Sequence, residues 1–244
     1  MGQILIFGAS STVALACAKI WARRGDEFIL VARTRERLTP KIQGLRNSVL
    51  AEYFQDLGDC GENQALVDEI FLKYPRIDKV FIAHGYLGGQ AESENTWQEA
   101  EKQICVNYMS VVSLLHPCAD HLSARGKGQI AVLTSVAGQR GRPRNYTYGS
   151  AKGGLSIFLQ GLRSRLWPRI AVTDLVLGPV DTPMTKDHRK NFSFATAESA
   201  ALKIVSAVDR RVSRAFVPGY WRWVCLLVRL MPEAVFQRLK FLRD

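Results

Sequence analysis

Residues 135–152, SVAGQRGRPRNYTYGSAK, place a serine, a tyrosine and a lysine at a spacing that suits acid–base chemistry. Tyr148 and Lys152 are one helical turn apart, so they share a face if this segment is a helix. An ammonium beside a phenol favours the phenolate, and we therefore expect Lys152 to lower the pKa of Tyr148 from about 10. Such a tyrosine can exchange a proton with an alcohol or carbonyl oxygen, and the hydroxyl of Ser135 could hold the same oxygen.

These groups suit the reduction of a ketone or the oxidation of an alcohol, but the pattern is not specific by itself. A tyrosine and a lysine four residues apart also occur on ordinary surface helices. The elements around them must therefore decide whether they belong to a ligand-binding site.

Short apolar runs alternate with amphipathic segments about seven times along the chain. This alternation predicts an α/β fold, a doubly wound parallel sheet of the Rossmann type with about seven strands and helices on both faces. We expect one such domain over residues 1–217, with no internal linker or repeat. The expected strands are residues 3–7, 27–32, 49–54, 78–83, 129–134, 170–177 and 214–217, and the main helices are residues 14–24, 63–74, 96–123, 146–166 and 197–209.

A run of small residues, Gly8 to Ala14, follows the first expected strand and leads into a helix. In this context backbone N–H groups and the positive end of the helix can bind the pyrophosphate of a dinucleotide. Thr12 and Ala14 stand where further glycines are usual, so an ordinary strand-to-helix turn is the alternative.

The second expected strand ends at Ala32-Arg33, a position that faces the adenosine ribose in folds of this type. An acidic residue there would bind the 2′-hydroxyl of NAD, whereas an arginine can pair with the 2′-phosphate of NADP. We therefore favour NADP(H) over NAD(H), with a solvated surface charge as the alternative for Arg33. Asp56, after the third strand, could contact the adenine or cap the next helix.

The composition is that of a globular protein with 244 residues and a formal net charge of +11. Five scattered cysteines without a C-x-x-C pair suggest neither disulfides nor a metal site, which suits the cytoplasm. The first apolar run is too short for a signal peptide, and no run is long enough to span a membrane. Nucleic acid, an anionic membrane or a phosphorylated ligand could explain the charge, but no nucleic-acid-binding motif accompanies it, and we predict no nucleic-acid partner.

The last segment, residues 218–244, combines aromatic and leucine residues with interleaved arginines and lysines: FVPGYWRWVCLLVRLMPEAVFQRLKF covers most of it. This pattern predicts a basic amphipathic helical tail, a helix pair lying in the interface of an anionic membrane. Packing on the domain, or a contact between subunits, is the alternative. If the tail docks on lipid, the protein is peripheral to the inner face of the membrane.

The motifs GASSTVA, QDL, IAHG, LTSVAG, YGSAK and LGPVDTPM, with Asn107, occur in the order and spacing of the short-chain dehydrogenase/reductase family. The chain resembles that family over about residues 3–219. The resemblance implies that Tyr148 is the catalytic acid/base, that Lys152 tunes it and holds the nicotinamide ribose, that Ser135 orients the carbonyl and that Asn107 anchors a water in a proton relay. It also implies a homo-oligomer, a dimer or tetramer.

The cofactor contacts implied by the resemblance fall into groups along the chain. The phosphates and ribose would be lined by Gly8, Ser10, Ser11, Thr12 and Val13, and the adenine would contact Asp56 and Leu57. Ala83 and Gly85 would lie along the adenosine and ribose. The nicotinamide end would contact Gly178, Val180 and Thr182. The chain departs from the family at Thr12 and Ala14, and it has Gly178-Pro179 where Pro-Gly is usual.

Three segments, AHGYLG, RPRNYTYGSAKGGL and the tail, are more specifically similar to the subfamily that reduces a 2-keto-pentofuranose linked to decaprenyl phosphate. We therefore expect an NAD(P)H-dependent reductase of a ketone, with a small or lipid-linked carbonyl substrate. The alternative of another class is a non-catalytic dinucleotide-binding sensor or scaffold, supported only by the altered glycine run.

Overall fold

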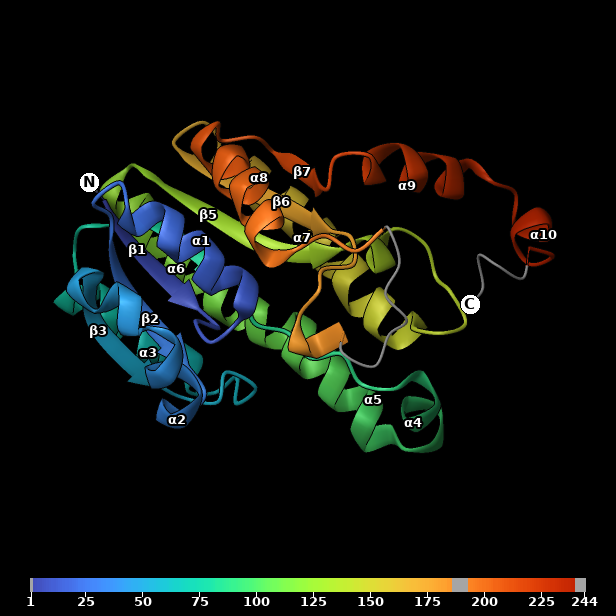
Figure 1. Cartoon of the computed structure of the whole chain (residues 1–244), viewed down its shortest axis with the longest axis horizontal. Helices are drawn as coiled ribbons and strands as arrows, with labels where there is room; N and C mark the ends of the chain where they lie inside the picture. The colour runs from blue at the N-terminus through green and yellow to red at the C-terminus, as the bar shows by residue number, and fades with distance from the viewer. Residues whose placement is uncertain (1, 186–192, 240–244) are drawn as a thin grey trace.

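The computed structural model describes residues 2–185 and 193–239. Its centre is a parallel seven-stranded sheet in the order β3-β2-β1-β4-β5-β6-β7 (Figure 1), which confirms the predicted doubly wound architecture. The strands are β1 (Gln3–Phe7), β2 (Glu27–Ala32), β3 (Val49–Phe54), β4 (Ile77–Ile82), β5 (Gly128–Ser135), β6 (Ile170–Leu177) and β7 (Arg214–Val217). Their sequences are nearly continuous apolar runs because helices bury both faces of the sheet.

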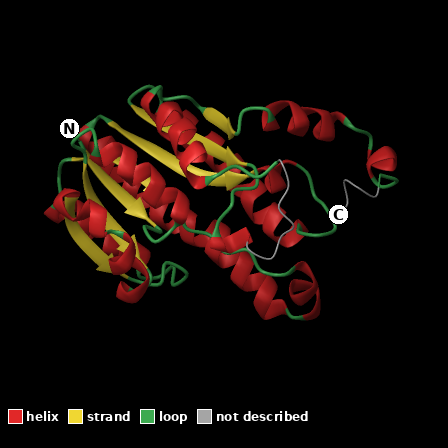
Figure 2. Cartoon of the chain, in the orientation of Figure 1, coloured by secondary structure: helices red, strands yellow, loops and turns green. Residues whose placement is uncertain are grey.

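Helices cover both faces of this sheet (Figure 2). One face carries α1 and α8, and the other carries α3, α6 and α7, each group with its own buried apolar cluster. The helices are α1 (Thr12–Ala22), α2 (Arg35–Leu38), α3 (Asn63–Lys73), α4 (Gln90–Asn95), α5 (Trp97–Ile104), α6 (Ser110–Arg125), α7 (Tyr146–Leu166), α8 (Ala197–Asp209), α9 (Trp221–Leu230) and α10 (Glu233–Phe236). Short 3₁₀ turns lie at Thr39–Lys41, Gln43–Ser48, Val136–Gln139 and Pro183–Thr185.

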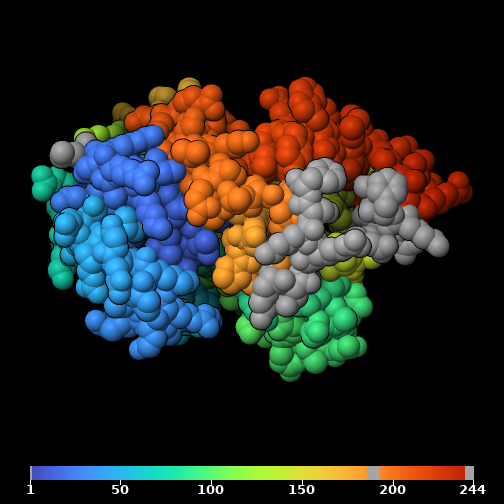
Figure 3. All heavy atoms as spheres, viewed as in Figure 1, coloured from blue at the N-terminus to red at the C-terminus, as the bar shows by residue number. Residues whose placement is uncertain are grey.

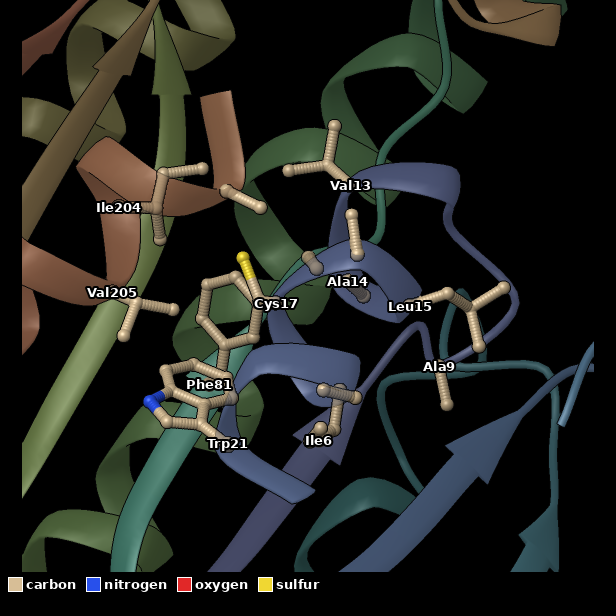
Figure 4. Close-up of a cluster of buried hydrophobic side chains, with 14 of the residues drawn as sticks. Ile6, Ala9, Val13, Ala14, Leu15, Cys17, Trp21, Phe81, Ile204 and Val205 are labelled. Carbon is tan, nitrogen blue, oxygen red and sulfur yellow. The ribbon is translucent and has the colours of Figure 1, made fainter. Parts of the chain in front are cut away.

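The helix α1 lies close to the sheet because small side chains form the contact. Ala14 is 1% exposed, and its methyl group belongs to the core between α1 and its neighbours. Figure 4 shows Cys17 and Trp21 of α1 beside Phe81 of β4, with Ile204 and Val205 of α8 next to them in the same cluster. The Trp21 and Phe81 rings meet edge to face at 5.4 Å. Alanine thus serves at a position where glycine is usual, since its methyl group is accommodated in the core.

The predicted helical stretch 96–123 is two helices joined without a loop. Between α5 and α6 the chain makes one wider π-helical turn, Cys105–Met109, with Asn107 inside it. Such turns are frequent at functional sites because the extra residue shifts the side chains relative to a regular helix. Here the turn carries a polar side chain that is fully buried.

The described part of the tail contains α9 and α10, and α9 packs against the sheet end. Cys225 is buried in a small cluster with Val136 and Val176. The guanidinium of Arg140 donates hydrogen bonds to the carbonyls of Val228 and Met231, both at 2.5 Å, close to the end of α9. These carbonyls have no partner within the helix, so Arg140 fixes the end of α9 to the loop that follows β5. Within the described residues no helix is both long and apolar enough to cross a bilayer.

Candidate active site

A cavity of about 1330 Å³ lies at the carboxyl ends of the strands. The strand order reverses between β1 and β4, and ligands of such sheets bind at this reversal. The volume exceeds the range of about 300–1,000 Å³ that is usual for one small ligand, so a dinucleotide and a substrate have room together. The predicted site residues that line it are Gly8, Ser10, Ser11, Thr12, Val13, Arg33, Asp56, Leu57, Ala83, Gly85, Ser135, Tyr148, Lys152, Gly178, Val180 and Thr182.

The run after β1 forms a cradle of backbone at the start of α1. Gly8 has a φ of 75°, and a Cβ added there would lie 2.5 Å from the backbone nitrogen of His84. Only glycine therefore allows the ends of β1 and β4 to approach this closely. Ser11 caps α1 by accepting a hydrogen bond from the N–H of Ala14 at 3.5 Å. This cradle, with the positive end of α1 behind it, fits a pyrophosphate despite the missing glycines.

Basic residues gather where the ends of β2 and β3 meet this cavity. Arg33 lies 3.9 Å from the carboxylate of Asp56, and both side chains are about half exposed. Arg37 and Lys41 also line the cavity, and Lys41 donates a hydrogen bond to the carbonyl of Ser10 at 2.9 Å. Neither residue was predicted to bind the cofactor, although the run RTRERLTPK contained the signal. Together with Arg33 they form a cationic end that suits a phosphate ester.

Close packing brings Ser135 and Tyr148 together. A Cβ added to Gly138 would lie 2.6 Å from the backbone nitrogen of Gly153, so α7 lies directly against the turn that follows β5. Ser135, the last residue of β5, accepts a hydrogen bond from the N–H of Ala137 at 3.1 Å and shares another with the phenol of Tyr148. The serine hydroxyl and the phenol thus face the same point of the cavity.

The expected lowering of the Tyr148 pKa is wrong. Burial of the phenol raises its pKa to about 12, and the hydrogen bond with Ser135 opposes this only in part. Burial likewise lowers the pKa of Lys152 to about 8, while the carboxylate of Asp174 raises it. The Lys152 ammonium lies 5.9 Å from the centre of the Tyr148 ring, so desolvation outweighs the charge that the sequence spacing suggested. The phenol is therefore protonated at neutral pH.

Behind the cavity, Lys152 is held in a buried polar network. Lys152 is 3% exposed, and its ammonium donates a hydrogen bond to the carbonyl of Leu133 at 3.2 Å. Asp174, fully buried in β6, accepts hydrogen bonds from Thr134 at 2.5 Å and from Arg214 at 2.9 Å. Asp174 was not among the predicted site residues, although an acidic residue inside the apolar run IAVTDLVL was a usable signal. The paired carboxylate supports a charged Lys152.

Asn107 lies behind the cavity wall, and among the described residues it is not part of the lining. Its amide exchanges hydrogen bonds with the backbone of Tyr86, at 3.1 and 2.6 Å, and donates another to the carbonyl of Gln103 at 2.8 Å. A Cβ on Gly85 would lie 3.0 Å from the Asn107 oxygen and 3.5 Å from the Lys152 nitrogen. Asn107 thus holds the loop after β4 in place next to Lys152, and its role in a proton relay stays a prediction.

The tail helix α9 completes the cavity beside Gly178. Trp221, Val224 and Val228 line it, and a Cβ on Gly178 would lie 2.1 Å from the indole nitrogen of Trp221. Glycine at the end of β6 therefore makes room for an indole from the tail. The tail was predicted to lie on a membrane, with packing on the domain or a contact between subunits as the alternative, and α9 packs on the domain here. Its contribution to the cavity was not predicted, because no local pattern shows where a terminal helix folds back.

Comparison with known proteins identifies the type of site. Residues 3–192 match the family profile described as short chain dehydrogenase. An uncharacterized oxidoreductase of Mycobacterium tuberculosis is 30% identical over 244 residues, which cover 97% of this chain and 96% of the relative. A putative ketoacyl reductase of the monensin polyketide synthase from Streptomyces virginiae is 30% identical over 81% of this chain and 78% of the relative. The crystal structure of a Burkholderia cenocepacia short chain dehydrogenase in complex with NADP superposes with a TM-score of 0.84, at 16% identity, over 98% of this chain and 97% of the other.

Proposed function

The chain belongs to the short-chain dehydrogenase family and is an oxidoreductase that acts between an alcohol and a carbonyl group with a nicotinamide dinucleotide; on this premise, we propose that it reduces a ketone with NADPH. The observation that supports this reaction is the placement of Ser135 and Tyr148 together in the cavity, and burial raises the pKa of the phenol to about 12, so that it holds a proton to donate. A protonated acid in the site can donate to a developing alkoxide, whereas oxidation of an alcohol would need a base.

In this proposal each residue has a separate task. Tyr148 gives its proton to the carbonyl oxygen as that oxygen gains negative charge. Ser135, which shares a hydrogen bond with the phenol, holds the same oxygen in line. Lys152 stabilises the phenolate that remains, and Asn107 keeps the loop beside Lys152 in position. The cofactor supplies the hydride to the carbonyl carbon when it is bound.

The cofactor-binding residues are also part of the proposal. The cradle from Gly8 to Val13 would hold the pyrophosphate, Asp56 and Leu57 the adenine, and Ala83 and Gly85 the ribose region. Gly178, Val180 and Thr182 would hold the nicotinamide end. The cationic end with Arg33, Arg37 and Lys41 favours NADP(H), because a 2′-phosphate would complement its charge.

Replacement of Arg33 by alanine should weaken NADPH binding about tenfold or more and change NADH binding little, since only NADPH carries a 2′-phosphate. Fluorescence titration with both cofactors measures the difference. Arg35→Ala is a matched control, because the Arg35 guanidinium lies 4.9 Å from the centre of the Phe54 ring and does not line the cavity. Equal losses for NADPH and NADH in Arg33→Ala, or a wild-type preference for NADH, would contradict the assignment.

The experiment that tests the reaction is NADPH oxidation, followed by absorbance, with a panel of ketosugars, ketolipids and simple diketones. We expect turnover with at least one ketone and slower or no reduction of NADP by the corresponding alcohol near neutral pH. A protein that binds NADPH tightly but oxidises it with no member of the panel would instead favour the non-catalytic sensor or scaffold.

For the substrate, we propose a carbonyl compound with a lipid chain, presented at an anionic membrane by the tail. The helix α9 has two faces: Val224 and Val228 line the cavity, while Trp223, Leu227 and Leu230 are 62%, 68% and 73% exposed. Figure 3 shows the tail helices (red) at the end of the molecule opposite the β2–β3 side (blue). A bilayer on the exposed face of α9 would lie about one helix diameter from the part of the cavity that Val224 and Val228 line.

The division of the chain into a domain of residues 1–217 and a tail of residues 218–244 stays a prediction, because Cys225 and Val228 of α9 are buried against the domain. A peripheral location on the cytoplasmic side of the membrane, where anionic lipids attract the cations of α9, is part of the membrane proposal. The homo-oligomer, dimer or tetramer, stays a prediction that sedimentation of the purified protein can check.

A further inference from the structure

An arginine whose side chain has no partner among the described residues lines the same cavity as Tyr148. Arg142 lies in the loop between β5 and α7, six residues before Tyr148, and lines the cavity with Val224 and Val228 of α9. Its Nε atom is buried and has no hydrogen-bond partner, and the side chain forms no ion pair within the described parts of the chain. By contrast, Arg140, two residues earlier, uses its guanidinium for hydrogen bonds to α9 and for an ion pair with Glu233 at 2.7 Å.

Among the described residues, no carboxylate forms an ion pair with Arg142. Burial lowers the pKa of the Arg142 guanidinium; the nearby Cys225 side chain opposes this, and the like charge of Arg144 acts in the same direction as burial. The neighbouring thiol of Cys225 is neutral, because burial raises its pKa. The carboxylates among the described lining residues are Glu36 and Asp56. Both lie where β2 and β3 meet the cavity, beside the cationic end formed by Arg33, Arg37 and Lys41. A desolvated cation without a counter-charge is costly, so an arginine in this position suits a ligand that supplies one.

A second buried donor without a partner lies on the α9 wall. The indole nitrogen of Trp221 has no hydrogen-bond acceptor among the described residues, although it is buried next to Gly178. Trp221 and Cys225 belong to the same small cluster, and Cys225 is the neighbour of Arg142. Two residues that line the cavity, Arg142 and Trp221, therefore each carry a buried N–H group without a described partner, and buried donors are rarely left in this state without a functional reason.

We propose that Arg142 binds an anionic group of the carbonyl substrate, a phosphate ester or a carboxylate, with the indole N–H of Trp221 as a second donor. Val224 and Val228 would cover the apolar part of the same molecule. This inference rests on the proposed function, and it names the chemical class of the substrate: a ketone that carries a negative charge at a fixed distance from its carbonyl. Arg142 is then a specificity residue, separate from the acid Tyr148.

The test is isothermal titration calorimetry of the full-length protein saturated with NADPH, so that the sites for the cofactor phosphates are filled. The probes are phenyl phosphate, benzoate and benzyl alcohol, which share a ring and differ in the charged group. We expect phenyl phosphate or benzoate to bind at least about tenfold more tightly than benzyl alcohol, and the stronger of the two identifies the preferred anion. Arg142→Gln should weaken the binding of that anion by about 10- to 100-fold, the range of a charge-assisted hydrogen bond, and Arg142→Lys should weaken it by less.

Arg165→Gln is the matched control, because Arg165 lies on α7 outside the cavity and pairs with Asp120 at 3.0 Å. The Arg165→Gln variant loses the same charge and should keep the full preference for the anionic probe over benzyl alcohol. Trp221→Phe keeps an aromatic ring but removes the indole N–H, and it should weaken the binding of the anion about threefold or more. If Arg142→Gln does not fold, this variant and Arg142→Lys still carry the test.

Equal affinities of the three probes, or an undiminished preference in Arg142→Gln, would overturn the inference. The outcome is separable from that of the proposed function. A protein that binds phenyl phosphate through Arg142 but reduces no ketone refutes only the reaction. A protein that reduces neutral ketones and shows no preference for an anion refutes only the anion site.

Discussion

Tyr148→Phe should lower kcat for ketone reduction at least 100-fold while NADPH affinity changes little. The substitution removes the hydroxyl that donates the proton and keeps the ring that fills this part of the cavity. A positioned acid typically contributes about 10²- to 10⁴-fold, which sets the size of the expected loss. Steady-state NADPH oxidation and a fluorescence titration of NADPH measure the two quantities on the same preparation.

Tyr146→Phe is the control for this experiment. Tyr146 lies two residues earlier on α7, is 47% exposed, and hydrogen-bonds Glu94 at 3.0 Å without lining the cavity. The Tyr146→Phe variant loses a phenol hydroxyl from the same helix and should retain wild-type turnover. A Tyr148→Phe enzyme that keeps more than about a tenth of kcat would show that another group supplies the proton.

The fold could be predicted because its signals are local. Each strand is a short apolar run next to an amphipathic segment, and the ends of β1, β2, β3, β6 and β7 match the expected ends. The residues that line the cavity could be predicted for a related reason. Parallel strands bring their carboxyl ends to one edge, so the residue after each run, such as Gly8 or Ser135, must lie at that edge.

What the sequence could not give depends on distance and burial rather than on spacing. The four-residue step from Tyr148 to Lys152 is correct as helix geometry, yet the pKa of the phenol rises because desolvation exceeds the effect of the ammonium. Spacing places two groups on one face and says nothing about the dielectric around them. The tail is a second case, because the contact between Trp221 and Gly178 joins segments more than forty residues apart.

The exposed face of α9 gives the other large expected effect. Trp223, Leu227 and Leu230 recur at intervals of four and three residues, so they lie on one side of the helix, with Arg222 and Arg229 among them. None of these three side chains lines the cavity. Because Cys225 and Val228 are packed inside, removing the whole tail would also damage the domain; substitutions on the outer face are therefore the sharper test.

The triple variant Trp223→Gln, Leu227→Gln, Leu230→Gln should lower binding to anionic vesicles about 100-fold or more, since each lost apolar contact costs at least about 1 kcal/mol. Co-sedimentation with vesicles of phosphatidylglycerol and phosphatidylcholine measures it, with circular dichroism as a check of folding. Wild-type binding should weaken with salt but persist, because apolar burial supplies most of the affinity and each nearby cation adds about 1 kcal/mol.

The control for this variant changes three equally exposed apolar residues elsewhere: Leu72, Trp167 and Leu202, which are 84%, 76% and 63% exposed. Glutamine at these positions removes the same kinds of side chain, one tryptophan and two leucines, from α3, the end of α7 and α8. If the α9 face binds lipid, this control sediments with vesicles as the wild type does. Wild-type protein that stays in the supernatant would contradict lipid binding and favour the outer face of α9 as a contact between subunits. An equal loss in both triple variants would also contradict it, because a general apolar effect does not distinguish one helix from another.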